Sequence, residues 1–337
     1  MTSKQHAHTF DTTIEWNLSP WASNRPYLKP KFHANVISHR PKSTCDSPYY
    51  TYVQSPLCDA IVERLPPWLA PNLITIWGFG WNVLVLLIML YLYGNSMDGY
   101  FDPRLAFFAG ICYFLFQTAD NCDGKQARKN GTGSVMGMLF DHGLDATTGI
   151  LVNVILARML NVGSGVPALL VIQVSTVSYY FLMLEEYYIG LLHLPMFIGP
   201  DDVSLYISGL CFLCAYKGSG DWWTEMIDAP FGLDQLLGVP SLKRSTLVVL
   251  FFYVLEVFGY MFGSGFKYWM ARNEEHFKER FTVTSFSMHV GYMVLLMLIY
   301  DIYGIFCGSD ILETHPRSVV FCFAGQHLQA TLRLIVS

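Results

Sequence analysis

Eight long apolar segments, separated by short polar ones, limit what this chain can fold into. A membrane-spanning α-helix needs about 20 mostly apolar residues, because the hydrocarbon core of a bilayer is roughly 30 Å thick. The segments that we expect to cross are Leu73–Tyr93, Leu105–Ala119, Leu139–Leu160, Val166–Leu184, Val203–Tyr216, Leu247–Phe266, Thr282–Tyr300 and Ser318–Val336. They predict an all-α fold, a polytopic transmembrane helical bundle with about eight spans.

The composition agrees with a membrane protein. Hydrophobic residues make up 53% of the 337 residues and charged residues 14%, whereas soluble domains carry about 25% charged residues. The aromatic content of 15% suits belts at a membrane interface. The net charge of −5 gives no indication of nucleic-acid binding. The N-terminal residues lack the apolar core of a cleavable signal peptide, so we expect the first span to direct insertion.

We divide the chain into four parts. Residues 1–45 are polar and predict a mobile tail. Residues 46–71 alternate loosely between apolar and polar side chains, which predicts an interfacial amphipathic segment lying on the membrane. Residues 72–217 form the catalytic transmembrane region, and residues 218–337 supply the remaining helices, with a C-terminus that we expect to be shortened.

Four aspartates interrupt the apolar pattern in two pairs. Asp120 and Asp123 are three residues apart, and Asp141 and Asp145 are four apart, so on helices each pair lies on one face. The turn-forming residues 130–134 allow the chain to reverse between the two helices. Carboxylates beside hydrocarbon are costly unless a partner offsets their charge. Their hard oxygen atoms suit Mg²⁺ or Mn²⁺, and we predict that two such ions join all four side chains.

Other residues of the same stretch suit a substrate that carries phosphate groups. Gly124 and Gly137 remove side chains where a backbone or a phosphate must approach closely. Arg128 can pair with phosphate oxygens through two parallel hydrogen bonds. Metal ions neutralise phosphate oxygens and steady a leaving phosphate. Because the site opens at the membrane face, we infer transfer of a phosphate-bearing group to a lipid acceptor.

The stretch from Asp120 to Asp145 fits the pattern D-x-x-D-G-x-x-A-R-x8-G-x3-D-x3-D at all of its fixed positions. This pattern resembles the signature of the CDP-alcohol phosphotransferase family. The run W-L-A-P-N-x-I-T from Trp68 to Thr75 resembles the entry segment of the eukaryotic choline/ethanolamine branch. The resemblance implies that Asn72 contacts the nucleotide, although an ordinary helix N-cap is an alternative reading of this residue. It also assigns Gly124, Ala127, Arg128 and Gly137 to substrate binding.

The resemblance implies a transferase of phospholipid synthesis. Phosphoethanolamine or phosphocholine would pass from CDP-ethanolamine or CDP-choline to diacylglycerol with release of CMP, in the endoplasmic reticulum or Golgi membrane and in a homodimer. A rival reading is another CDP-alcohol phosphatidyltransferase, such as phosphatidylinositol synthase. A second rival is a truncated, non-catalytic regulatory isoform, since members of this branch have about ten spans.

The base that accepts the proton of the attacking hydroxyl has two candidates. His142 lies three residues before Asp145, so the two side chains are neighbours on a helix. Asp145 would orient the imidazole, and adjacent cations would keep it neutral and able to accept a proton. Alternatively, Asp145 is itself the base and His142 only packs.

A second segment resembles the family pattern E-x-Y…L-P…G-P-x-E-G, with Glu185 and Tyr187 at its start. Here Asp202 stands where Glu is usual and Val203 where Gly is usual. An acid at this place could meet the ammonium of the head group, with tyrosine faces adding cation–π contacts. The alternative is a set of solvated loop acids. Glu256 and His289 lie inside apolar segments and are further candidates, unless each only bonds a neighbouring helix.

The distribution of basic residues orients the predicted spans. With the aspartate stretch on the cytosolic side, Lys and Arg number fourteen there and five on the opposite side. This asymmetry agrees with the positive-inside rule. The candidate site would then face the cytosol, where a nucleotide can reach it.

The eight cysteines predict no zinc site. Cys211 and Cys214 form the only C-x-x-C motif, which lies in an apolar helical run without a His or Cys partner at zinc spacing. We expect buried packing for all eight.

Overall fold

The computed structural model describes the chain except for residues 1–42, 219, 231, 233–239, 307–314 and 337. Almost all of the predicted tail, residues 1–45, therefore lies outside the described residues. Arg40–Ser337 form one compact unit.

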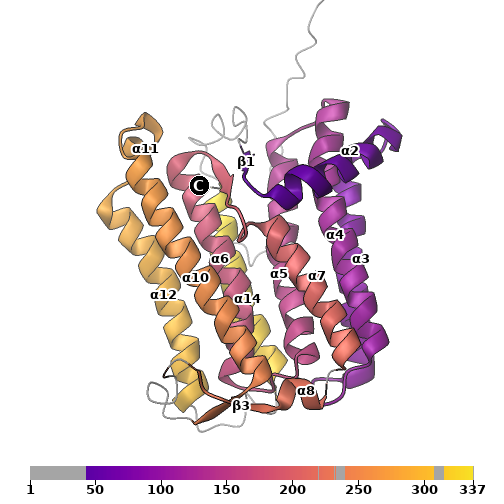
Figure 1. Ribbon diagram of the computed structural model, residues 1–337. Coiled ribbons are helices and arrows are strands. Elements are labelled where there is room, and N and C mark those ends of the chain that lie inside the picture. Colours follow the sequence, from indigo (N-terminus) through magenta and orange to yellow (C-terminus); the bar gives the residue numbers. More distant parts are fainter. Residues whose placement is uncertain (1–42, 219, 231, 233–239, 307–314, 337) are drawn as a thin grey trace, which may run out of the picture. The chain divides into compact units, whose positions relative to one another are not determined.

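Long helices account for every segment that the sequence predicted to span. They are α3 (Pro71–Tyr93), α4 (Pro103–Asn130), α5 (Val135–Met159), α6 (Val166–Ile189), α7 (Pro200–Lys217), α10 (Arg244–Ala271), α12 (Val283–Phe306) and α14 (Pro316–Val336). Figure 1 shows them side by side as a bundle. Within the described residues, α3, α6, α10 and α12 are long and apolar enough to cross a membrane. The chain is thus an all-α protein of the integral membrane type.

Shorter elements lie at the two ends of the bundle. The π-helix Tyr50–Gln54 runs into α2 (Ser55–Arg64), and α8 (Asp221–Thr224) and α11 (Glu275–Arg280) follow later in the chain. The strands are β1 (Ser43–Cys45), β2 (Leu192–Leu194), β3 (Met226–Asp228) and β4 (Ser241–Lys243). β1 pairs with β2 in parallel and β3 with β4 antiparallel. The first pair ties the segment before α2 to the connection between α6 and α7.

Local sequence signals set the ends of the helices that carry the aspartates. The side chain of Asp102 accepts a hydrogen bond from the backbone of Arg104 and caps α4, and Pro103 occupies the first helical position, where it loses no bond. Gly131 ends α4 in a left-handed conformation with φ +66°. Ser134 caps α5 by accepting from the backbone N–H of Gly137 at 3.0 Å. α4 therefore continues well past the predicted end at Ala119, through both of its aspartates.

Helices α3 and α4 pack unusually closely. A Cβ built on Gly78 would lie only 2.7 Å from the Cβ of Ala119, so no larger residue fits at position 78 without a shift. Ala119 immediately precedes Asp120. On the other side, α4 packs against α7, while α6 packs against α10, α14 and α5. These contacts set the positions of α4 and α5, which carry the site.

The segment predicted to lie on the membrane is helical and packs partly on the bundle. Figure 1 shows α2 lying across the ends of the long helices, and α2 contacts α4. Cys58 and Val62 are buried, whereas Tyr52, just before α2, is 80% exposed. One face of this segment therefore packs on protein.

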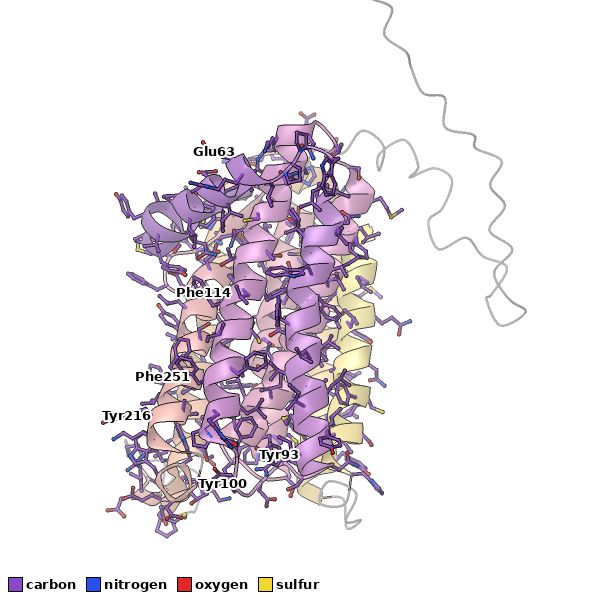
Figure 2. All side chains as sticks on the ribbon, turned by 90° about the vertical axis from the view of Figure 1, so that its right-hand side faces the viewer. Glu63, Tyr93, Tyr100, Phe114, Tyr216 and Phe251 are labelled. Atoms are coloured by element: carbon purple, nitrogen blue, oxygen red, sulfur yellow. The ribbon has the colours of Figure 1, made fainter. Side chains whose placement is uncertain are left out.

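Aromatic side chains mark the end of the bundle opposite α2. In Figure 2, Tyr93, Tyr100 and Tyr216 lie toward one end and Glu63 toward the other, with Phe114 and Phe251 between them. Tyr216 is 82% exposed and Phe251 is 62% exposed. Tyrosine, whose hydroxyl reaches toward water, near the end of a bundle and exposed phenylalanine further along it are the arrangement that a bilayer favours.

Candidate metal and substrate site

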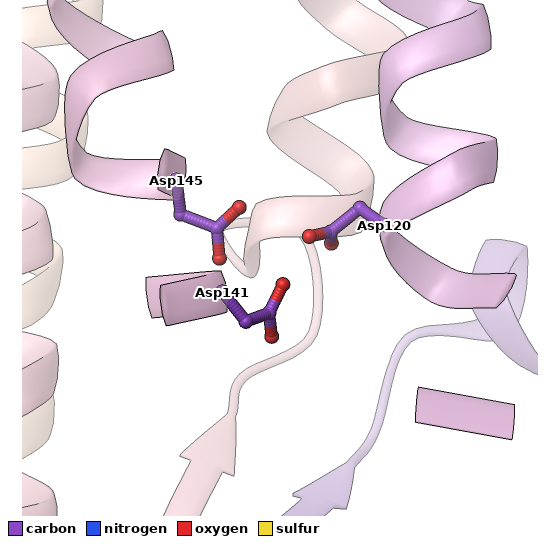
Figure 3. Close-up of side chains that lie close together, drawn as sticks. All are labelled: Asp120, Asp141 and Asp145. Atoms are coloured by element: carbon purple, nitrogen blue, oxygen red, sulfur yellow. The ribbon is translucent and has the colours of Figure 1, made fainter. Parts of the chain in front are cut away.

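Carboxylates from α4 and α5 converge at one point. Asp120 comes from α4, and Asp141 and Asp145 come from successive turns of α5. One ligand oxygen of each lies within 4.8 Å of the others. Figure 3 shows the three carboxylates pointing toward one another. The described part of the chain therefore holds an acidic cluster able to bind a divalent metal ion.

Asp123 lies beside this cluster, and its charge acts on Asp120, Asp141 and Asp145. The Thr75 hydroxyl of α3 donates a hydrogen bond to Oδ2 of Asp123. The structure thus gathers three of the four predicted aspartates at one point, with the fourth close enough to interact with them electrostatically. Carboxylates gathered in this way require protons or cations between them, since like charges repel.

Arg128 is the predicted cation of this region, and its side chain is exposed. It acts electrostatically on Asp123, and its guanidinium lies 3.6 Å from the place where a Gly124 side chain would begin. The two residues occupy one face of α4. Ala127, one turn before the end of α4, accepts backbone hydrogen bonds from Gly131 and Thr132.

Asn72 reaches the start of α5. A Cβ on Gly137 would lie 3.5 Å from Oδ1 of Asn72 and 3.2 Å from Oγ of Ser134. Helix α3 begins at Pro71 with Ala70 as its N-cap, so Asn72 is the second helical residue. The N-cap reading of Asn72 was therefore wrong, because the proline takes the first helical position. The exposed amide of Asn72 is left available to a ligand.

His142 lies on α5 between the two aspartates and is half-buried. Its backbone carbonyl accepts a hydrogen bond from the hydroxyl of Tyr179 at 3.0 Å. Tyr179 belongs to α6, which the sequence did not connect with the aspartates. The charges of Asp141 and Asp145 act on the Tyr179 hydroxyl. Tyr179 is therefore a residue beside the site that the sequence did not indicate.

The acids of the second predicted segment have partners inside the protein. Glu185 is 1% exposed and accepts from Nζ of Lys267 at 2.7 Å and from Oγ of Ser264 at 3.1 Å. Asp202 accepts from Oγ of Ser47 at 2.7 Å and from the backbone N–H of Phe197 at 3.0 Å. These two carboxylates are therefore not the solvated loop acids of the alternative reading.

Tyr187, the third residue predicted in that segment, lies under the guanidinium of Arg280. The guanidinium carbon is 4.9 Å from the centre of the Tyr187 ring. One face of the ring thus already meets a cation of the protein.

Asp201 is an acid of that segment that contacts α4, the helix that carries Asp120. It is 3% exposed, and Nδ2 of Asn121 and Nε2 of Gln117, both on α4, donate to its Oδ1 at 2.8 and 3.1 Å. Burial raises the pKa of Asp201, and these hydrogen bonds oppose the rise. Its charge acts on Asp120 and Asp145. Only its place after Pro200, in the first turn of α7, signalled it in the sequence.

A cavity of about 140 Å³ begins beside the aspartates and extends into the bundle. Asp120 and Asp145 lie on its wall together with apolar side chains such as Phe116, Ile150 and Leu182. The candidate Glu256 lines this cavity and also lines a second, apolar cavity of about 70 Å³. The other intramembrane candidate is His289, whose Nδ1 lies 2.8 Å from the Tyr188 hydroxyl of α6. His289 therefore bonds a neighbouring helix, as its alternative reading predicted.

The cysteines are only partly as expected. Cys211 and Cys214 are buried free thiols, but Cys322 is exposed and Cys45 half-buried. The prediction of burial was wrong for these two positions. Cys322 lies on α14, where an apolar side chain can face lipid.

Together, these features define a helical membrane protein with an acidic metal-type centre that opens into an apolar cavity. Residues 68–217 match the CDP-alcohol phosphatidyltransferase family, and this stretch contains all four predicted aspartates. Over this stretch, somewhat less than half of its length, the chain is similar to that family.

Similar proteins of known name cover most of the chain. Choline/ethanolaminephosphotransferase 1 of Arabidopsis thaliana is 29% identical over 86% of this chain and 73% of its own length. Ethanolaminephosphotransferase 1 of Homo sapiens is 29% identical over 92% of this chain and 77% of its own. An uncharacterised class-I family protein of Schizosaccharomyces pombe is 34% identical over 59% of this chain. In that last comparison, the chain spans about half the length of the relative, 50%.

Proposed function

We propose that this protein transfers phosphoethanolamine or phosphocholine from CDP-ethanolamine or CDP-choline to diacylglycerol and releases CMP. The observation that carries the proposal is the convergence of Asp120, Asp141 and Asp145 on the wall of an apolar cavity. A charged nucleotide and a lipid can meet only where such a centre and such a cavity adjoin. The names of the similar proteins support the same reaction.

The donor set fits two Mg²⁺ or Mn²⁺ ions. All four side chains offer hard oxygen atoms. Asp141 lies close to Asp120, and its carboxylate also interacts electrostatically with Asp123. We propose Asp120, Asp141 and Asp145 as ligands of one ion, with Asp123 and Asp141 serving the second. When bound, the ions neutralise phosphate oxygens and make CMP a better leaving group.

The side chains around the aspartates would then hold the two substrates. Arg128, exposed beside Gly124, pairs with phosphate oxygens, while Asn72 and the open position at Gly137 receive the nucleotide. Diacylglycerol occupies the cavity with its hydroxyl toward Asp145. The hydroxyl oxygen attacks the phosphorus that bears the head group, and the bond from that phosphorus to CMP breaks.

The proton of the attacking hydroxyl passes to His142, with Asp145 as the alternative base. The two residues occupy the same stretch of α5, and the Tyr179 hydroxyl fixes the backbone of His142. Proton transfer to a positioned side chain contributes roughly a hundred- to ten-thousandfold in rate. Separate substitutions of His142 and Asp145 distinguish the two candidates.

The head group would be met by acids of α6 and α7. Glu185, Tyr187 and Asp202 were the sequence candidates, but Glu185 is already paired with Lys267. The adjacent Glu186 forms no ion pair among the described residues, and its charge acts on Tyr179. We propose Glu186 as the carboxylate at this place that is available to an ammonium group.

The same proposal includes the membrane arrangement. The eight long helices each cross the bilayer, the 46–71 segment rests on its surface, and residues 72–217 form the catalytic region. The excess of Lys and Arg on the side of the aspartates supports a site facing the cytosol. We place the protein in the endoplasmic reticulum or Golgi and expect a homodimer.

Labelled substrates test the reaction. Purified protein in lipid vesicles is given diacylglycerol with CDP-ethanolamine or CDP-choline, or inositol with CDP-diacylglycerol, each with and without Mg²⁺. We expect Mg²⁺-dependent product only from the first two donors. Asp123→Ala should abolish it, while Asp98→Asn, an exposed aspartate at the opposite end of the bundle, should not.

Each rival reading predicts a different result of this experiment. Product from CDP-diacylglycerol alone would support the phosphatidylinositol-synthase type. No product from any donor, with protein that is folded and binds Mg²⁺, would support a regulatory isoform.

A further inference from the structure

The inner part of the cavity beside the aspartates carries polar groups that the proposed reaction does not use. His327 of α14 lines this cavity and is 1% exposed. Neither ring nitrogen of His327 has a hydrogen-bond partner among the described residues. The ring of Phe323 lies against it, with ring centres 4.2 Å apart, so that its orientation is fixed by packing.

Thr148 is a second unpartnered group on the same wall. It is 1% exposed, and its hydroxyl has no hydrogen-bond partner in the part of the chain that the structure describes. Thr148 follows Asp145 by three residues on α5, which places it about 4.5 Å further into the bundle on the same face of the helix. The Thr148 hydroxyl is thus a hydrogen-bond donor close to the Asp145 carboxylate, further into the cavity.

Leaving such groups without partners is expensive. A buried donor or acceptor without a hydrogen bond has lost its contacts with water and gained nothing in exchange, and two such side chains line this cavity. A protonated imidazole would also be costly inside the bundle, so His327 is neutral, with one N–H donor and one acceptor nitrogen. The cavity is therefore suited to a ligand that is mainly apolar and carries hydrogen-bond acceptors.

The position of the two groups identifies the acceptor. In a glycerolipid, two glycerol carbons separate the free hydroxyl oxygen from the nearest ester, which puts that carbonyl oxygen roughly 4 to 5 Å away at ordinary bond lengths. Thr148 lies at about this depth below Asp145. An acceptor lipid with its hydroxyl at Asp145 therefore brings ester carbonyls to the inner part of the cavity.

We propose that His327 and Thr148 donate hydrogen bonds to the ester carbonyls of the lipid acceptor, and so select ester-linked over ether-linked glycerolipids. This inference rests on the proposed function, since it assumes that the acceptor hydroxyl lies at the aspartates. Both side chains act as positioning residues. The acyl chains continue into the apolar second cavity, which shares Asn153, Ser175 and Glu256 with the first.

Binding and turnover of two matched lipids test the inference. A short-chain diacylglycerol and the dialkylglycerol of equal chain length differ in the ester carbonyls. Loss of one hydrogen bond of about 1 kcal/mol lowers affinity roughly fivefold. His327→Phe and Thr148→Val should therefore each weaken diacylglycerol binding about fivefold and raise its KM similarly. Dialkylglycerol binding and the KM for the CDP-alcohol should stay unchanged.

Two further variants separate recognition from folding. His327→Gln keeps an N–H donor and should restore much of the preference for diacylglycerol. Ser208→Ala removes another buried, unpartnered hydroxyl that lies on α7 away from both cavity walls, and it should leave the preference intact. Equal loss for both lipids, or no change in their ratio, would overturn the inference and point to ordered water as the partner.

Direct binding keeps this test separate from that of the reaction. If the unaltered protein binds diacylglycerol preferentially but forms no product from any CDP-alcohol, the proposed function fails and the ester contact stands. If it forms product from diacylglycerol and dialkylglycerol with equal efficiency and binds both equally, the ester contact fails and the function stands.

Discussion

Buried charges occur at both ends of the bundle, but the groups that surround these charges differ between the two ends. At one end, Asp120, Asp141 and Asp145 converge within 4.8 Å of one another, and the charge of Asp123 acts on them. At the other end, two buried arginines donate to backbone carbonyls. Arg158 reaches the carbonyls of Gly99 and Tyr100 at 2.5 and 2.8 Å, and Arg317 those of Gly94 and Ser96.

The difference separates structural charge from functional charge. The arginines are 3% and 2% exposed. The two terminal nitrogens of each guanidinium donate to backbone carbonyls of the connection between α3 and α4, so the arginines hold that connection in place. The aspartates gather charge of one sign, which favours the fold only when cations are present. Substitutions should therefore lower stability at the arginine end and lower activity at the aspartate end.

Among substitutions that spare the aspartates, the largest effect should come from the proposed base. His142→Ala should reduce turnover roughly a hundred- to ten-thousandfold, because the attacking hydroxyl would keep its proton, while Mg²⁺ binding should persist. Asp145→Asn should reduce both. Turnover and Mg²⁺ titrations of the purified variants measure this. Near-normal turnover of His142→Ala would assign the base to Asp145 instead.

Substitution of a buried arginine should lower the stability of the protein. Arg158→Met removes two charged hydrogen bonds and a cation–π contact with Tyr93, whose ring centre lies 4.7 Å from the guanidinium. We expect a loss of about 2 to 4 kcal/mol in the free energy of unfolding, with kcat per folded molecule unchanged. Denaturation in detergent measures it. A loss of kcat without a loss of stability would contradict the division between the two ends.

Metal binding should stabilise only through the aspartate end. At a hundredfold excess over its Kd, Mg²⁺ should add about 2.7 kcal/mol to the stability of the protein. Asp120→Asn should remove most of this gain, yet it should raise the Tm of metal-free protein by relieving repulsion. Thermal unfolding with Mg²⁺ and with a chelator gives both values, and Arg158→Met should retain the full Mg²⁺ shift.

The smallest effect should come from the opening beside Asn72. Gly137→Ala places a methyl group 3.2 Å from Oγ of Ser134 and 3.5 Å from Oδ1 of Asn72, so it crowds the place proposed for the nucleotide. We expect the KM for the CDP-alcohol to rise a few-fold, about 1 kcal/mol or less, with the KM for diacylglycerol unchanged. Steady-state kinetics with each substrate varied in turn measure the KM for the CDP-alcohol and the KM for diacylglycerol separately.

Local signals made the helices and the acidic cluster predictable. Apolar length located each long helix, and the spacing of the aspartates placed each pair on one helical face, because both depend only on neighbouring residues. Only the N-cap alternative for Asn72 was wrong, because the rule that favours Asn at an N-cap gave way to the preference of Pro71 for the first helical position.

Long-range partners could not be predicted in the same way. The sequence cannot show that Lys267 neutralises Glu185, 82 positions earlier, or that Tyr179 reaches the backbone of His142. Nor does any local pattern bring His327, near the end of the described chain, to the cavity that begins at Asp120. These contacts depend on how α6, α10 and α14 pack, and many different packings satisfy the same apolar pattern.

The contact between Gly78 and Ala119 has a consequence for how the centre is assembled. Thr75, which donates a hydrogen bond to Asp123, stands one turn before Gly78 on α3. The absence of a side chain at position 78 therefore determines how closely the Thr75 hydroxyl approaches that carboxylate. A larger residue at position 78 would push α3 away from α4 and weaken this hydrogen bond without touching Asp123 itself.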